Sequence, residues 1–138
     1  MFKLLGRIDI DGTKASIDKC ALIASIPSGT IKQIGLKRKV PIVDAWLYAS
    51  PWYRFHLDTM DDEIRDFLTA HSRVGDALAA RDAGIAYAFF TLCPVETKDE
   101  GSFAGIFSLE TLKLLASMGL ELQISPATVM PDSPYWKR

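Results

Sequence analysis

Apolar and polar residues alternate at the start of the chain, and this two-residue period is typical of a strand with one buried face. Charged residues separate the apolar positions, which are Phe2, Leu4, Ile8 and Ile10. An Asp-Gly pair at 11–12 then gives a turn signal. We therefore expect the chain to begin with a strand that ends near residue 11.

Three later segments also have strand patterns. Residues 40–50 alternate between a mixed face and an apolar face, and Pro41 near their start favours an edge position or the beginning of a strand. Residues 85–92 are apolar on both faces, which predicts a central strand. Residues 120–125 alternate again and form the expected last strand. Residues 30–39 show no clear period.

Four segments have the 3.6-residue period of helices with one apolar stripe. Thr59 is a suitable N-cap, and the carboxylates at 61–63 would lie in the first turn, where the helix dipole favours them. Ser108 is a second cap, and its helix should end at Gly119 with Leu109, Leu112, Leu115 and Ala116 facing the core. The expected helices span residues 15–24, 59–71, 72–82 and 108–119.

The order of these elements predicts an α+β fold. About four strands should form one mixed or antiparallel sheet, with the helices packed on one face. Residues 1–125 are expected to be a single domain, since a chain of 138 residues has the usual size of one domain and no linker is visible. Residues 126–138 hold three prolines and little pattern, so we expect a C-terminal tail there.

Composition and charge narrow the function classes. The chain is 49% apolar and 24% charged, with a net charge of −1, which is ordinary for a soluble globular protein. A nucleic-acid-binding protein needs a surplus of Lys and Arg, so no nucleic-acid partner is expected. No membrane partner is expected either, because the longest uncharged run, residues 83–95, is far shorter than the ~20 residues that span a bilayer. Without a signal-peptide pattern, the expected location is the cytoplasm.

Residues that support catalysis or metal binding are sparse. His56 and His71 are the only histidines, and neither belongs to a recognisable Ser–His or Cys–His arrangement. His71 lies on an apolar stripe, so we expect a packed histidine with one hydrogen-bond partner. Cys20 and Cys93 stand alone and should behave as small buried apolar residues. The sequence therefore predicts a protein that is not an enzyme, with no catalytic residues, metal or cofactor.

Acidic and aromatic residues around the second helix indicate a binding surface. Asp58, Asp62 and Asp66 are spaced four apart, and like charges at this spacing repel one another on a helix. Compensation of the helix dipole explains the carboxylates of the first turn, whereas an acidic face for a basic partner would explain the whole group. Trp and Tyr are enriched at interface hot spots, although they are also ordinary core residues. The candidate partner-binding residues are Trp52, Tyr53, His56, Asp58, Asp62 and Asp66.

Three signatures, taken in order, resemble a known family. They are a strand, turn and helix at 8–26, a strand that contains Trp46, and GIFSLETLKLLASMGLELQIS at 105–125. Together they resemble a widespread bacterial family catalogued as domain of unknown function four-two-seven-nine, over nearly the whole chain. The resemblance implies a small cytoplasmic bacterial protein without established catalytic residues. Some members of that family look like the immunity proteins found beside secreted toxins.

The sequence leaves three functional hypotheses. The first is a non-enzymatic protein-binding domain of the immunity type, which neutralises a bacterial toxin by covering its active site. The alternative is a homodimeric structural or small-ligand-binding domain, in which an edge strand at 40–50 pairs across a two-fold axis and the aromatic loop lines a pocket. The third is a weak enzyme that uses His56 and Asp58, with Asp62 as a further metal ligand.

Overall fold

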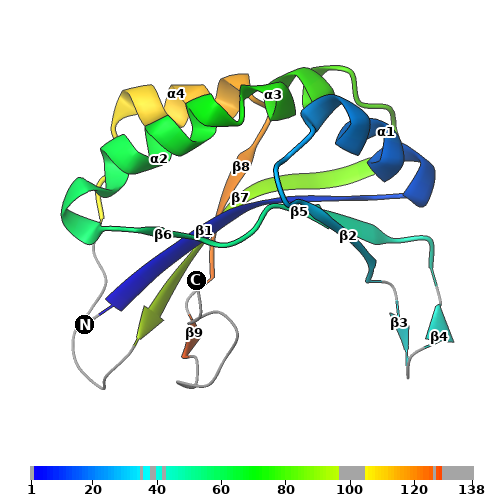
Figure 1. Ribbon diagram of the computed structural model, residues 1–138, viewed down its shortest axis with the longest axis horizontal. Helices are drawn as coiled ribbons and strands as arrows, with labels where there is room; N and C mark the ends of the chain where they lie inside the picture. Colours follow the sequence, from blue (N-terminus) through cyan, green and yellow to red (C-terminus); the bar gives the residue numbers. More distant parts are fainter. Residues whose placement is uncertain are drawn as a thin grey trace.

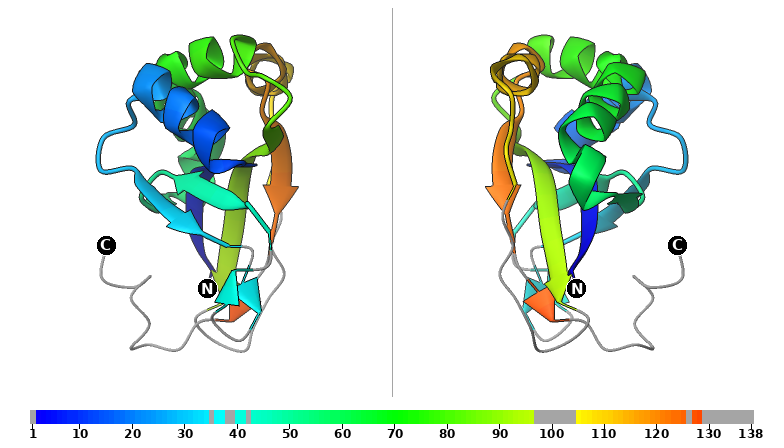
Figure 2. Two further views of the ribbon diagram at one scale, coloured as in Figure 1. Left: turned by 90° about the vertical axis from the view of Figure 1, so that its right-hand side faces the viewer. Right: turned by 90° about the vertical axis from the view of Figure 1, so that its left-hand side faces the viewer.

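The computed structural model describes residues 2–34, 36–37, 40–41, 43–96, 105–125 and 127–128. These residues form two layers, a twisted sheet and a layer of helices over one face of it (Figure 1). The two side views show the described α-helices together on that face (Figure 2). The predicted α+β class, with helices packed on one face of the sheet, is confirmed, but the main sheet among the described residues has seven strands where about four were expected.

The centre of the sheet is an antiparallel pair of long strands, β1 (Phe2–Gly12) and β7 (Ile85–Glu96). The two strands pair along almost their whole length, with a shift in register at Gly12. The central position of β7 agrees with the prediction from its apolar sequence. The strand continues past its predicted end at residue 92, so residues 93–96 are also part of the sheet.

Shorter strands flank this pair. The order across the sheet is β2, β5, β1, β7 and β8, while β6 also pairs with β1 and β9 also pairs with β7. β8 and β9 run parallel to β7, whereas β5, β6 and β7 run antiparallel to β1. The bounds are β2 (Thr30–Gln33), β5 (Trp46–Ala49), β6 (Tyr53–Phe55), β8 (Glu121–Ile124) and β9 (Ala127–Thr128), and β3 (Leu36–Lys37) pairs with β4 (Val40–Pro41) in a separate hairpin.

The single edge strand predicted at 40–50 is wrong in two respects. β4 and β5 are separate strands, and residues 43–45 between them belong to neither. β5 also lies between β2 and β1 and is therefore an interior strand. The edge is occupied by β2, whose side chains are mostly exposed, and a strand exposed on both sides has no apolar period to reveal it.

The helices begin and end where side chains or backbone geometry satisfy their terminal groups. Thr13 and Ser108 each accept the backbone N–H three residues further on. Thr59 stands at the N-cap position of α2, although its hydroxyl donates to Glu63 instead of accepting a cap bond. Gly119 follows α4 with a φ of 76°. The bounds are α1 (Lys14–Ala24), α2 (Met60–Ala70), α3 (Ser72–Ala79), α4 (Leu109–Ser117) and the 3-10 turn η1 (Leu57–Thr59).

The core lies between the helices and the face of the sheet that they cover. Phe90 of β7 is fully buried, and its ring centroid lies 6.2 Å from that of Phe55 and 5.7 Å from that of Phe67. His71 packs on Phe67 and donates from Nδ1 to the Phe67 carbonyl at 2.7 Å, which confirms the expected packed histidine. Trp46 is half-buried against this core.

Alternate residues of β1 point to the opposite face of the sheet. Ile8 and Ile10 face the helices, whereas Arg7, Asp9 and Asp11 point to the other side, which we call the far face. Asp9 is buried there, although its neighbours in the strand are apolar residues of the core. The far face therefore contains a polar group that the helices do not cover.

The predicted C-terminal tail is described only at Ala127–Thr128, which pairs with β7 as β9. Its remaining residues, and residues 97–104, lie outside the described part of the chain. Within the described part, no helix is long and apolar enough to cross a membrane.

Candidate functional site

The structure separates the six predicted partner-binding residues. Trp52 lies on the far face, with its ring centroid 4.3 Å from the guanidinium carbon of Arg7. Tyr53 points the other way and packs against Phe67 and His71 beneath α2. Neighbouring residues of an extended chain alternate in direction, so these two aromatic rings cannot share one surface. The other predicted residues are exposed around the start of α2, and they are His56, Asp58, Asp62 and Asp66.

Glu63 fixes the turn that leads into α2. Its carboxylate accepts the His56 backbone N–H at 2.9 Å and the Thr59 hydroxyl at 2.7 Å, and it lies 2.9 Å from His56 Nδ1. The pKa of Glu63 is lowered, and the hydrogen bond with the His56 ring is the largest cause. Partial burial acts in the opposite direction, but the hydrogen bonds from Thr59 and the His56 backbone add to the lowering. The His56 ring therefore pairs with Glu63 and not with Asp58, the partner that the enzyme hypothesis requires.

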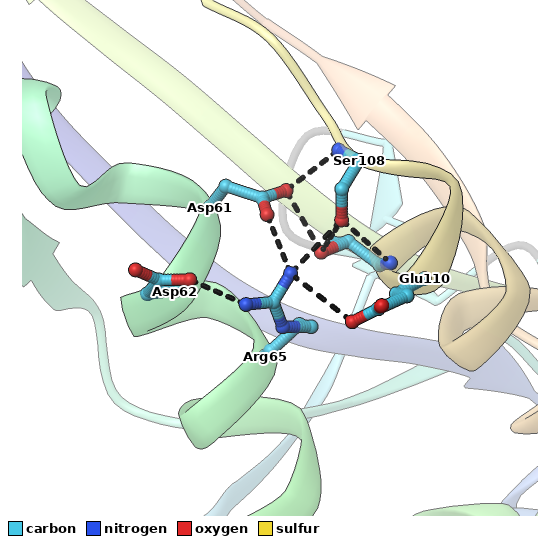
Figure 3. Close-up of polar contacts among 6 residues, drawn as sticks. Asp61, Asp62, Arg65, Ser108 and Glu110 are labelled. Atoms are coloured by element: carbon cyan, nitrogen blue, oxygen red, sulfur yellow. Dashed lines mark hydrogen bonds and ion pairs between the residues drawn. The ribbon is translucent and has the colours of Figure 1, made fainter.

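Asp61 connects the start of α2 to the start of α4. Its Oδ1 accepts the Ser108 backbone N–H and the Thr111 hydroxyl, both at 2.8 Å, and its Oδ2 accepts Arg65 Nη1 at 2.7 Å. Figure 3 shows the carboxylate between the two helices. Burial acts to raise the pKa of Asp61, but the bonds from Ser108 and Thr111 and the charge of Arg65 outweigh it, and the pKa is lowered. We call Asp61, Arg65, Ser108 and Thr111 the clasp.

Arg65 is the cation of the clasp. Its Nη1 also donates to Ser108 Oγ at 2.9 Å and lies 3.7 Å from the Glu110 carboxylate, while its Nη2 pairs with Asp62 (Figure 3). Asp62 and Glu110 nevertheless keep 75% and 82% of their side chains exposed. One guanidinium thus holds the two helices together, and the outer carboxylates remain accessible.

This corner of the molecule has an excess of negative charge. Residues 56–70 and 105–117 together contain six carboxylates and two cations, Arg65 and Lys113. Of the carboxylates, Asp61 and Glu63 are largely engaged in hydrogen bonds, whereas the other four are exposed. A basic partner would therefore be attracted to this corner.

Aliphatic side chains lie beside these carboxylates. Ile106, Leu109 and Leu112 have exposed fractions of 85%, 66% and 43%. Successive helix residues turn by about 100°. Leu109 therefore points outward from α4, Glu110 points toward α2, and Leu112 points to the side of α4 that faces away from α2. We call the exposed residues of these two helix starts that face outward or toward the other helix the α2–α4 surface, and they are Asp58, Asp62, Asp66, Ile106, Leu109 and Glu110.

The described residues offer little for catalysis. They include no group of three or more His, Cys, Asp or Glu side chains placed to hold a metal. Cys20 is buried, Cys93 is half-buried, and both are free. Burial raises the pKa of each thiol, which makes the nucleophilic thiolate scarcer at neutral pH.

Two features of the site were missed by reasoning from the sequence. Asp61 was assigned to the helix dipole alone, because its partners Ser108 and Thr111 lie 47 and 50 positions away. The inward positions of α4 were also misassigned, since Leu109 and Leu112 are exposed while Thr111, Leu115 and Met118 are buried. The i, i+4, i+7 spacing of this last set is the signal that identifies the buried side of α4.

No protein-family model, curated protein or solved structure matches this chain. The resemblance to the bacterial family of unknown function stays a prediction.

Proposed function

We propose that this domain is a non-enzymatic protein-binding module whose α2–α4 surface covers a basic surface on a partner protein. The observation that supports this proposal most directly is the combination of exposed carboxylates with exposed aliphatic side chains on two helices that the clasp holds together. Apolar groups exposed beside charged ones are characteristic of protein interfaces.

Each part of the surface would have a different effect on binding. The four exposed carboxylates would speed the encounter with a basic partner and exclude acidic ones. Leu109 and its aliphatic neighbours would bury apolar area once the complex forms, and such central contacts determine most of the affinity. The clasp would reduce the entropy lost on binding, because α2 and α4 are already fixed relative to each other.

Within this proposal, the specific role is that of an immunity protein in the cytoplasm that neutralises a bacterial toxin. A toxin that cuts nucleic acid has a basic cleft for its polyanionic substrate. The α2–α4 surface would occupy that cleft with its carboxylates and so exclude the substrate. No catalytic group of the domain is needed for this function.

The proposal is tested by affinity capture from the source cells, with matched charge and apolar variants. Asp62→Lys and Leu109→Glu change the α2–α4 surface, while Asp76→Lys on α3 and Leu22→Glu on α1 change exposed residues of the same kinds elsewhere. We expect wild type and both controls to retain one stoichiometric basic protein, and both surface variants to lose it. The complex should also weaken as salt concentration rises.

A second step separates immunity from other protein binding. The captured protein, purified alone, should degrade DNA or RNA, and equimolar wild-type domain should stop this activity while Leu109→Glu should not. Two results would contradict the proposal: surface variants that keep the partner as well as the controls do, or a wild-type domain that binds no protein and forms a stable dimer by light scattering.

A further inference from the structure

The far face carries a connected polar group drawn from three strands. Arg7 Nε of β1 lies 2.7 Å from Asp9 Oδ1, and the Thr91 hydroxyl of β7 donates to Asp9 Oδ2 at 2.7 Å. The same hydroxyl lies 3.2 Å from Oε1 of Gln123 on β8. Asp9 and Thr91 are 8% and 5% exposed. These contacts connect Arg7, Asp9, Thr91 and Gln123, and Arg7 stands at one end of the series.

The geometry of this group differs from that of an ion pair that serves stability alone. Burying two opposite charges is costly, and the cost is repaid best by a bidentate contact in which both carboxylate oxygens meet the guanidinium. Here Arg7 approaches Asp9 most closely through Nε, at one carboxylate oxygen, and the second carboxylate oxygen accepts from Thr91. The terminal nitrogens of Arg7 donate to no acceptor among the described residues, although only 22% of the Arg7 side chain is exposed.

Two further residues, Trp52 and Arg54, lie on the far face with Arg7. The Trp52 ring covers one side of the guanidinium at 4.3 Å, which limits its rotation. In the pairing of β6 with β1, Arg54 is opposite Leu5 and so shares the far face with Arg7. Arg54 is exposed. Two guanidinium groups, one oriented and one accessible, thus flank Trp52.

We propose that Arg7 is the centre of a carboxylate-binding site on the far face, in which its two terminal nitrogens bind the two oxygens of a ligand carboxylate. Asp9 and Trp52 are positioning residues, and Arg54 supplies a second positive charge. This site lies on the opposite side of the sheet from the helices, and the inference does not rest on the proposed partner surface.

Charge favours a carboxylate over a phosphate group. The planar fork of a guanidinium matches the two coplanar oxygens of a carboxylate. Asp9 lies in contact with Arg7, and Asp11 follows two positions along the same face. These two carboxylates oppose a ligand with a second negative charge, so a single-charged carboxylate fits the site better than a phosphate dianion.

The test is an NMR titration that observes arginine Nε–H groups in ¹⁵N-labelled protein. Benzoate is the probe, benzamide is its neutral equivalent, and inorganic phosphate is the competing anion. We expect benzoate to shift the Arg7 signal, identified by its loss in Arg7→Lys, whereas benzamide leaves it unchanged and phosphate shifts it only at much higher concentration. Arg7→Lys should weaken benzoate binding about tenfold, because a bidentate contact is lost.

Other variants test the site independently of Arg7→Lys, in case that substitution disturbs the fold. Arg54→Gln should weaken benzoate binding severalfold, and Arg73→Gln, an exposed arginine on α3, should leave it unchanged. Asp9→Asn should keep the Arg7 signal and narrow the preference for benzoate over phosphate, because it removes one of the two negative charges that oppose a dianion. The inference is overturned if benzoate fails to shift the Arg7 signal, if phosphate binds more tightly than benzoate, or if Arg73→Gln weakens binding as much as Arg54→Gln does.

Discussion

Asp61 and Asp62 are adjacent and chemically identical, but their surroundings differ completely. Asp61 accepts hydrogen bonds from Ser108 and Thr111 at the start of α4. Asp62 is mostly exposed and forms an ion pair with Arg65 through one carboxylate oxygen. Their different environments follow from the helix, because a step of one residue turns the side chain by about 100°. A side chain directed at α4 therefore contributes to stability, and its neighbour is available to a partner.

Replacing Asp61 by Ala should destabilise the fold by about 1–3 kcal/mol, because the Ser108 N–H and the Thr111 hydroxyl lose their acceptor in a partly buried place. Urea denaturation measures this free energy of unfolding. Asp66→Ala, an exposed carboxylate on the same helix, should change it by less than about 0.5 kcal/mol. Equal effects from the two variants would contradict the role given to the clasp.

The same variant should show a characteristic pH dependence. The pKa of Asp61 is lower in the folded protein than its ordinary value of 3.8. Its contribution to stability is therefore complete above that ordinary value and is lost as pH falls through the folded pKa. The difference in unfolding free energy between wild type and Asp61→Ala should be constant at neutral pH and shrink under acid conditions, whereas a difference that grows with acid would exclude this assignment.

Elements with strong local signals are those that the sequence predicts best. α1 and α4 have hydroxyl caps and periodic apolar residues within one short stretch, and β7 is recognisable from its apolar run. β2 could not be predicted, because its exposed side chains leave no period and only its pairing with β5 makes it a strand. The clasp and the Arg7 group were also inaccessible, since their members are brought together by helix and strand packing across long sequence separations.

Replacement by Ala should have opposite effects at two glycines, Gly119, which follows α4, and Gly75, which lies in α3 beside the end of α4. Gly119→Ala should destabilise the fold by about 1 kcal/mol, because its φ of 76° is unfavourable for a residue with a Cβ. Gly75 lies inside α3, where a Cβ would meet Met118 at an ordinary 3.4 Å. Gly75→Ala should therefore be neutral or stabilising by up to about 1 kcal/mol, through its higher helix propensity.

Thermal or urea unfolding of the two variants provides the measurement. If Gly119→Ala is as stable as wild type, the left-handed link between α4 and β8 is not formed as described. If Gly75→Ala is strongly destabilising, α3 and the end of α4 are packed more tightly than the structure indicates.

At the scale of the whole molecule, one core serves both layers. Phe90 of β7 contacts Phe67 of α2 and Phe55 of β6, so its ring joins the sheet to the helices. Phe90→Ala should destabilise the domain by about 3–5 kcal/mol. Tyr87→Ala, three positions earlier in the same strand and 59% exposed, should cost about 1 kcal/mol or less.

The two layers should also unfold together in these variants. Far-ultraviolet circular dichroism reports the helices, and in a Trp136→Phe background the fluorescence of Trp46 in β5 and of Trp52 beside β6 reports the sheet. The two transitions should coincide in this background with and without Phe90→Ala. Separate transitions would show that the helical layer and the sheet are independent folding units, which contradicts a shared core.

The pairing of β1 with β7 has a consequence for synthesis of the protein on the ribosome. β1 leaves the exit tunnel well before β7, but its longest ladder of backbone hydrogen bonds is to this strand, which starts at Ile85. Leu4, Ile8 and Ile10 must therefore stay without their native neighbours while more than half of the chain is translated. Native structure can form only late in translation, and contacts this distant in sequence favour slow folding. The nascent chain is thus the state most exposed to aggregation and to capture by chaperones.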